Sequence, residues 1–183
     1  TGVTARETSD QRQPVHLEQE LDRAITTFTN SMDTSELAIQ RAYAGDTCVL
    51  ALPDQLRQAF TNLLTNALQA MKGRGVIGLS TALTDTSVVT TITDSGPGIP
   101  KQHLSKIFDP FFTTKGQGEG SGLGLTVARR IIKKFGGDIR IESKEGIGTS
   151  CIVTLPTIPL LPPTQEASCT ESTSGSAPQS SSS

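Results

Sequence analysis

The chain has few cysteines, no long apolar run and no surplus of positive charge. Its three cysteines, Cys48, Cys151 and Cys169, are odd in number and show no CxxC spacing, so neither a disulfide framework nor a zinc site is indicated. A reducing compartment follows, and we expect a cytoplasmic location. No apolar run approaches about 18 residues and no signal peptide is recognisable, which excludes a membrane span here but leaves a membrane-anchored parent protein open.

The net charge of −2 gives no reason to expect nucleic acid or anionic lipid as a partner. Both of those partners need a clustered positive surface, and the basic residues of this chain are scattered. The nearest approach to a cluster is Arg129, Arg130, Lys133 and Lys134. These four residues lie on a predicted helix, where a solvated face is the simpler interpretation.

The hydrophobic fraction of 34% is low for a wholly folded chain of 183 residues, although that length suffices for one domain with a core. Between Pro156 and Ser183, 17 of 28 residues are Ser, Thr or Pro. We therefore expect a disordered tail over residues 156–183, a folded domain over residues 15–155, and a linker or remnant of a preceding segment over residues 1–14.

Apolar periodicity predicts a series of helices and paired strands along this domain. Helices are expected at residues 15–28, 53–72, 101–107 and 122–135. Strands are expected in three pairs, 36–43 with 47–52, 76–84 with 87–93, and 139–142 with 149–155. Strands grouped before and after helices predict an α/β (α+β) sandwich of two layers, in which a mixed, mostly antiparallel sheet carries helices on one face.

Two asparagines, Asn62 and Asn66, stand four residues apart in NLLTNALQA and so share one face of the predicted helix. That face is displaced from the buried stripe of Leu and Phe. An amide oxygen there can ligate Mg²⁺, a hard cation that takes oxygen ligands and also binds nucleotide phosphates. A local hydrogen-bonding role is the alternative for either residue, but their shared register favours function.

Asp94 ends a predicted strand and is followed by Ser-Gly-Pro-Gly, which forces a tight turn and exposes backbone. If its carboxylate faces a pocket, it can accept a hydrogen bond from the 6-amino group of adenine and would repel the 6-carbonyl group of guanine. Leaving such a buried polar group unpaired costs on the order of 10⁴-fold in discrimination, which predicts ATP over GTP. A plain turn residue is the alternative.

Four glycines alternate in GEGSGLGL at positions 118, 120, 122 and 124, directly before an amphipathic helix. The amino end of a helix offers free N–H groups and partial positive charge, and missing side chains let a phosphate reach them. A flexible linker is the alternative.

Three phenylalanines, Phe108, Phe111 and Phe112, flank this segment, and we expect them to anchor a mobile lid. Lys115 either meets a phosphate when this lid closes or is solvated.

The blocks NLLTNALQA, DSGPGIP, FDPFFTTK and GEGSGLGL occur here in the order found in the ATP-binding domain of bacterial sensor histidine kinases. Residues 15–155 resemble that domain, and FDPFFTTK is similar to kinases of the nitrogen-regulation type. The resemblance implies the Bergerat fold, shared with gyrase, the heat-shock ninety chaperones and mismatch-repair ATPases. It implies ATP and Mg²⁺ as ligands, with Asn62 and Asn66 catalytic, Asn66 as the metal ligand and Asn62 near the phosphates.

The resemblance also implies a wider nucleotide-binding set. Its further members are Asp94, Gly96, Gly98 and Ile99 at the adenine, Phe108, Phe112 and Lys115 in the lid, Gly120, Ser121, Gly122, Leu123, Gly124 and Leu125 at the triphosphate, and Thr149 near the nucleotide.

The ATPase relatives usually carry Glu where Asn62 stands, and that Glu activates water. Because Asn cannot accept a proton at neutral pH, phosphoryl transfer to a protein acceptor is favoured over hydrolysis. The family's phosphoacceptor helix, with a His followed by an acidic residue and a nearby proline, is missing; neither His16 nor His103 has that setting. The partners expected are therefore a histidine-bearing dimerisation domain of a homodimeric parent kinase and a response regulator.

Two alternatives share this fold. One is a serine kinase of the anti-sigma-factor type, which acts on a separate protein. The other is a non-catalytic nucleotide-sensing module that switches partners when its lid closes. An encoded phosphoacceptor helix upstream would eliminate the first, and turnover with an acceptor would eliminate the second.

Overall fold

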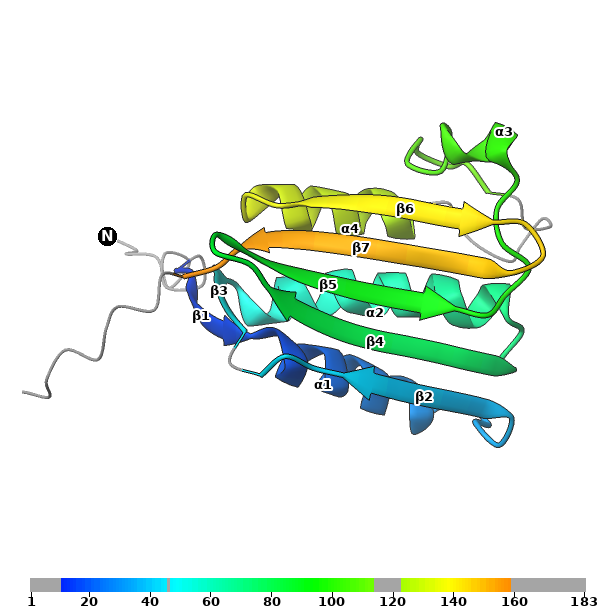
Figure 1. Cartoon of the computed structure of the whole chain (residues 1–183), viewed down its shortest axis with the longest axis horizontal. Helices are drawn as coiled ribbons and strands as arrows, with labels where there is room; N and C mark the ends of the chain where they lie inside the picture. The colour runs from blue at the N-terminus through cyan, green and yellow to red at the C-terminus, as the bar shows by residue number, and fades with distance from the viewer. Residues whose placement is uncertain (1–10, 46, 114–122, 159–183) are drawn as a thin grey trace, which may run out of the picture.

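The computed structural model describes residues 11–45, 47–113 and 123–158, and these form two layers (Figure 1). The helices are α1 (Leu17–Thr29), α2 (Pro53–Ala70), α3 (Lys101–Leu104) and α4 (Gly124–Lys134). The strands are β1 (Gln13–His16), β2 (Leu37–Ala42), β3 (Cys48–Ala51), β4 (Gly75–Leu83), β5 (Ser87–Asp94), β6 (Asp138–Lys144) and β7 (Gly148–Pro156).

The main sheet has the strand order β2-β4-β5-β7-β6, in which β2 runs parallel to β4 and the other neighbours are antiparallel. Helices α1, α2 and α4 cover one face of this sheet (Figure 1). The prediction of a two-layer sandwich with a mixed, mostly antiparallel sheet is therefore confirmed. The predicted hairpins are confirmed as β4–β5 and β6–β7, with the second one turning at Gly146, whose φ is +80°.

The prediction that the strands at 36–43 and 47–52 pair with each other is wrong. Strand β2 instead pairs with β4 in the main sheet, and β3 pairs with β1 in a separate two-stranded sheet where Val15 lies opposite Val49. Val15 and Val49 are both buried, so burying this apolar pair favours the non-local partner over the adjacent strand. Residues 15 and 16, predicted as the start of a helix, belong to β1, and α1 begins at Leu17.

Helix α2 is the central element of the helical layer and packs against α1 on one side and α4 on the other. Pro53 occupies its first turn, where a missing N–H costs nothing. The whole predicted apolar stripe is buried: Leu56, Phe60, Leu63, Leu64, Ala67, Leu68 and Met71. The position of α2 is thus set by apolar burial on that stripe, which leaves its polar face for other contacts.

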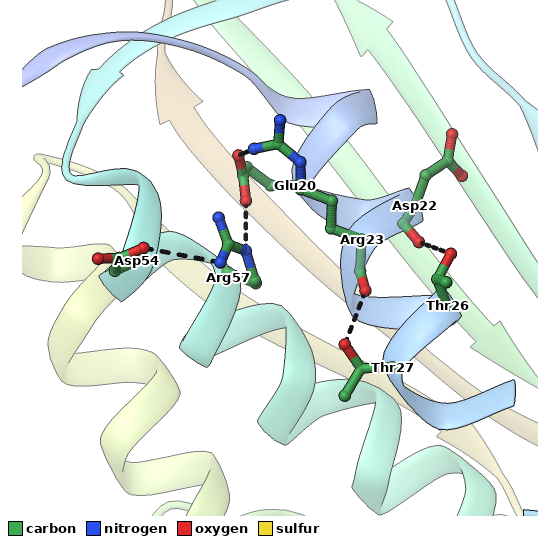
Figure 2. Close-up of polar contacts among 7 residues, drawn as sticks. All are labelled: Glu20, Asp22, Arg23, Thr26, Thr27, Asp54 and Arg57. Carbon is green, nitrogen blue, oxygen red and sulfur yellow. Dashed lines mark hydrogen bonds and ion pairs between the residues drawn. The ribbon is translucent and has the colours of Figure 1, made fainter. Parts of the chain in front are cut away.

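An ion-pair cluster joins α1 to α2 beside this core (Figure 2). The Glu20 side chain is only 3% exposed, and its two oxygens bond to Arg23 Nη1 at 2.7 Å and Arg57 Nε at 2.8 Å. Arg57 also approaches Asp54, which is 95% exposed, at 3.6 Å. Because both Glu20 oxygens are paired, its burial is tolerated.

The two cysteines in the described part of the chain, Cys48 and Cys151, are free thiols; Cys169 lies outside the described residues. Over residues 11–45, 47–113 and 123–158, no group of His, Cys, Asp or Glu is arranged to hold a metal ion. In the same ranges, every helix is too short or too polar to cross a bilayer.

Replacing Glu20 by Gln should lower the free energy of unfolding by about 2 kcal/mol, because two charge-assisted hydrogen bonds lose their anion inside the α1–α2 contact. The matched control is Asp54→Asn, which removes the exposed partner of the same Arg57 and should lower stability by only about 0.5 kcal/mol, from the lost charge in the first turn of α2. Urea denaturation followed by circular dichroism measures both. Equal midpoints for the two variants would show that the buried pairs do not stabilise the fold.

Candidate functional site

A cleft of about 560 Å³ opens between α2, the end of β5, the start of β7 and the first turn of α4. A volume of this size is typical of small-molecule sites. It is lined by these residues from the predicted binding set: Asn62, Asn66, Asp94, Gly98, Ile99, Phe112, Gly124, Leu125 and Thr149. Residues that are distant in the sequence therefore meet around one cavity.

One wall of the cleft is apolar. Its lining residues include Leu63 and Ala67 from α2, and Ile92, Ile141 and Cys151 from the strands. Sequence reasoning missed the three strand residues, although strand periodicity carried a signal. Residues two apart on a strand share a face, so Ile92 accompanies Asp94, and Cys151 accompanies Thr149.

Asp94 is the one carboxylate among the described lining residues. Burial raises its pKa above the ordinary value, and hydrogen bonds from the backbone N–H groups of Gly96 and Thr149 oppose that rise. The Gly96 N–H donates to Asp94 Oδ1 at 2.9 Å. When ionised, the carboxylate can only accept hydrogen bonds, so this end of the cleft suits a ligand group that donates them.

The glycines of the DSGPGIP turn hold this carboxylate through close backbone packing. Gly98 has a φ of +75°, and a side chain there would collide with the carbonyl group of Lys144 in β6. Gly146 N–H donates to Pro97 O at 2.7 Å, which locks the β6–β7 turn onto the same segment. Gly98 lines the cleft, whereas Gly96 is buried against Ala70 outside the lining and reaches the site through Asp94.

At the other end, the first turn of α4 lies against the two asparagines of α2. The Asn62 Nδ2 atom donates to Gly124 O at 3.3 Å. A methyl group added at Gly124 would come within 3.7 Å of Asn66 Oδ1. Both asparagines are half-buried and line the cleft, on a face separate from the buried stripe. Their side-chain amides therefore lie beside a helix amino end, where N–H groups and the helix dipole favour an anion.

The structure places only part of the glycine-rich block. Gly124 and Leu125 line the cleft, and Leu123 precedes the first residue of α4. Lys115, Gly120, Ser121 and Gly122 lie outside the described residues.

The three phenylalanines differ in their packing. Phe112 lines the cleft, with its ring edge-on to His103 at 5.6 Å between centroids. Phe108 is partly buried, and the Arg129 guanidinium lies 4.4 Å from its ring centroid. Phe111 is 73% exposed, in a turn where its φ is +65°. The expectation that Phe111 anchors the segment is therefore wrong.

The sequence indicated that Arg129 lies on a solvated face of the helix, but in the structure its side chain makes specific contacts. Besides stacking on Phe108, it bonds through Nε to Asp138 Oδ1 at 3.3 Å. Thr126, one turn earlier on α4, donates to Phe108 O at 3.2 Å. Two side chains of α4, Thr126 and Arg129, thus contact Phe108 in the segment before the glycine-rich block.

Residues 51–159 match the family of histidine kinase-, DNA gyrase B- and HSP90-like ATPases. The chain belongs to this family. Sensor histidine kinase ZraS of Escherichia coli K12 is 37% identical over 146 residues, which cover 79% of this chain and 31% of ZraS. The chain therefore spans about a third of the length of the curated relative, and within it corresponds to the catalytic ATP-binding domain.

Solved structures agree with this assignment. The catalytic domain of histidine kinase ThkA is 31% identical with a TM-score of 0.72, over 80% of this chain and 96% of that domain. Full-length ShkA in complex with AMPPNP is 25% identical with a TM-score of 0.70, over 80% of this chain and 31% of that one. The predicted Bergerat fold is confirmed by these neighbours.

Proposed function

We propose that this chain binds Mg²⁺·ATP in the cleft and presents the γ-phosphoryl group to a histidine on a dimerisation domain of its parent sensor kinase. The phosphoryl group then passes to an aspartate on a response regulator. The observation that carries this proposal is the two-ended cleft, with an acceptor-only carboxylate at one end and an asparagine-lined helix amino end at the other. The ShkA complex with AMPPNP, an ATP analogue, supports the choice of ligand.

The adenine is assigned to the Asp94 end. The apolar wall of Ile92, Ile141 and Cys151 offers a surface for a flat base, and the carboxylate accepts from its 6-amino group. Thr149 and Ile99 complete this end. A guanine base would bring its 6-carbonyl oxygen against the carboxylate, which favours ATP over GTP.

The phosphates are assigned to the α4 end. The residues fit Mg²⁺ there, because Asn66 lines the cleft beside the first turn of α4 and its amide oxygen is a hard donor of the kind this cation takes. Asn66 would hold the ion, which neutralises phosphate charge when bound. Asn62 donates one of its two amide N–H groups to Gly124 O, and the second can donate to a phosphate oxygen.

Transfer is favoured over hydrolysis because Asn62 cannot remove a proton from water. Neither histidine of the chain supplies the acceptor in this arrangement. His16 is exposed directly before α1, and His103 packs on Phe112. The acceptor therefore comes from a separate domain, and catalysis by this chain consists of positioning and charge neutralisation.

The wider assignments are part of the same proposal. We place the catalytic domain at residues 15–155, although β1 begins at Gln13, β7 ends at Pro156 and Val49 forms a bridge with Thr157. Lys115, Gly120, Ser121 and Gly122 complete the phosphate site. The parent is a homodimer whose catalytic part works in the cytoplasm, and neither nucleic acid nor lipid is a ligand of this domain.

Two substitutions at opposite ends of the cleft should change the affinities for ATP and adenosine in different ways. Asn66→Ala should remove most of the gain in ATP affinity that Mg²⁺ provides and leave metal-free adenosine binding intact, because only the phosphate end is changed. Asp94→Asn should reduce adenosine and ATP affinity alike by about 10²-fold, because the base loses its charged acceptor and meets an amide that can also donate. Calorimetric titration with and without Mg²⁺ measures both. If Asn66→Ala weakens adenosine as much as ATP, the assignment of the two ends is wrong.

A phosphotransfer assay tests which residue accepts the phosphoryl group. Incubated with γ-labelled ATP, Mg²⁺ and the histidine-bearing domain of its parent, the chain should label that domain with an acid-labile phosphate. Acid-stable label on serine would instead identify a kinase of the anti-sigma type. ATP binding without any label on the acceptor domain would identify a nucleotide-sensing module.

A further inference from the structure

Three polar side chains form a row across the sheet at the adenine end of the cleft. Ser143 of β6 lies opposite Thr149 of β7, and Thr149 lies opposite Asp94 of β5. Residues in register on adjacent strands point to the same face. Asp94 and Thr149 line the cleft, and Ser143, which is not among the lining residues, contacts Thr149.

The Ser143 hydroxyl has three partners at hydrogen-bonding distance. It accepts from Ile99 N–H at 2.7 Å and donates to Gly148 O at 2.9 Å. Its third contact is Thr149 Oγ1 at 2.8 Å. A serine hydroxyl has one hydrogen, and here that hydrogen goes to a carbonyl group, so all three bonds form together only if Thr149 is the donor.

This assignment fixes what Thr149 offers to a ligand. Its hydrogen is directed at Ser143, so the hydroxyl presents only lone pairs to the cleft. Together with the ionised Asp94, the row then consists of acceptors alone. A base with an amino group at position 6 satisfies such a row, whereas a base with a 6-carbonyl group does not.

We propose that Ser143 is a specificity-determining positioning residue, which excludes 6-oxopurines by holding the Thr149 hydroxyl as an acceptor. The proposal rests on the proposed ATP site. Ser143 also holds Ile99, so its loss could weaken every nucleotide; the diagnostic quantity is therefore the ratio of affinities for two bases that differ at position 6.

The test is titration of wild-type protein and Ser143→Ala with ADP and with IDP, which carry a 6-amino and a 6-oxo group. In Ser143→Ala the Thr149 hydroxyl can rotate and donate to the 6-carbonyl group. The preference for ADP over IDP should therefore fall by about fivefold, the size expected for one net hydrogen bond. Ser143→Thr keeps the hydroxyl and should retain the wild-type ratio. Ser150→Ala removes a hydroxyl from the opposite face of β7 and should also leave the ratio unchanged.

A Thr149→Val background tests whether Ser143 acts through Thr149. Thr149→Val alone should lower the ratio, and adding Ser143→Ala should lower it no further. Equal weakening of ADP and IDP by Ser143→Ala, or an undiminished ratio in Thr149→Val, would overturn the proposal while leaving the ATP site standing. Failure of wild-type protein to bind ADP would overturn the site itself and the proposal with it.

Discussion

The packing of the first turn of α4 against the asparagine face of α2 is the contact on which the cleft depends. Apolar burial along α2 and α4 brings the two helices together, and Asn62 Nδ2 donates to Gly124 O where they meet. A methyl group at position 124 would lie in ordinary van der Waals contact with the Asn66 amide, 3.7 Å from its oxygen. The end of the cleft proposed for the phosphates thus follows from the core packing of these two helices.

The end of the cleft proposed for adenine is held by a different set of contacts. There the DSGPGIP turn and the β6–β7 turn are interlocked through glycines and through the bond from Gly146 to Pro97. This fixes Asp94 in a half-buried position, where burial raises its pKa while two backbone N–H groups stabilise its charged form. A half-buried carboxylate with a raised pKa inside a cleft is the kind of group found at binding sites, which is consistent with the proposed role of Asp94 in recognition.

Local patterns predicted the features that local physics determines. The α2 stripe, the β4–β5 hairpin and the β6–β7 hairpin each follow from periodicity and turn residues within one segment. The partners of β2 and β3 could not be predicted in that way, because they are chosen by burial against strands far along the chain. The same limit applied to side chains. Arg129 meets Phe108, and Ser143 meets Ile99, across separations that no local pattern encodes.

The most direct test of the two-ended cleft is calorimetric titration of this chain with a non-hydrolysable ATP analogue and with its GTP counterpart, each with and without Mg²⁺. We expect one saturable site for the ATP analogue, tightened by Mg²⁺, and no comparable binding of the GTP analogue. Absence of saturable ATP binding, or equal binding of the two bases, would contradict the nucleotide site described for this chain.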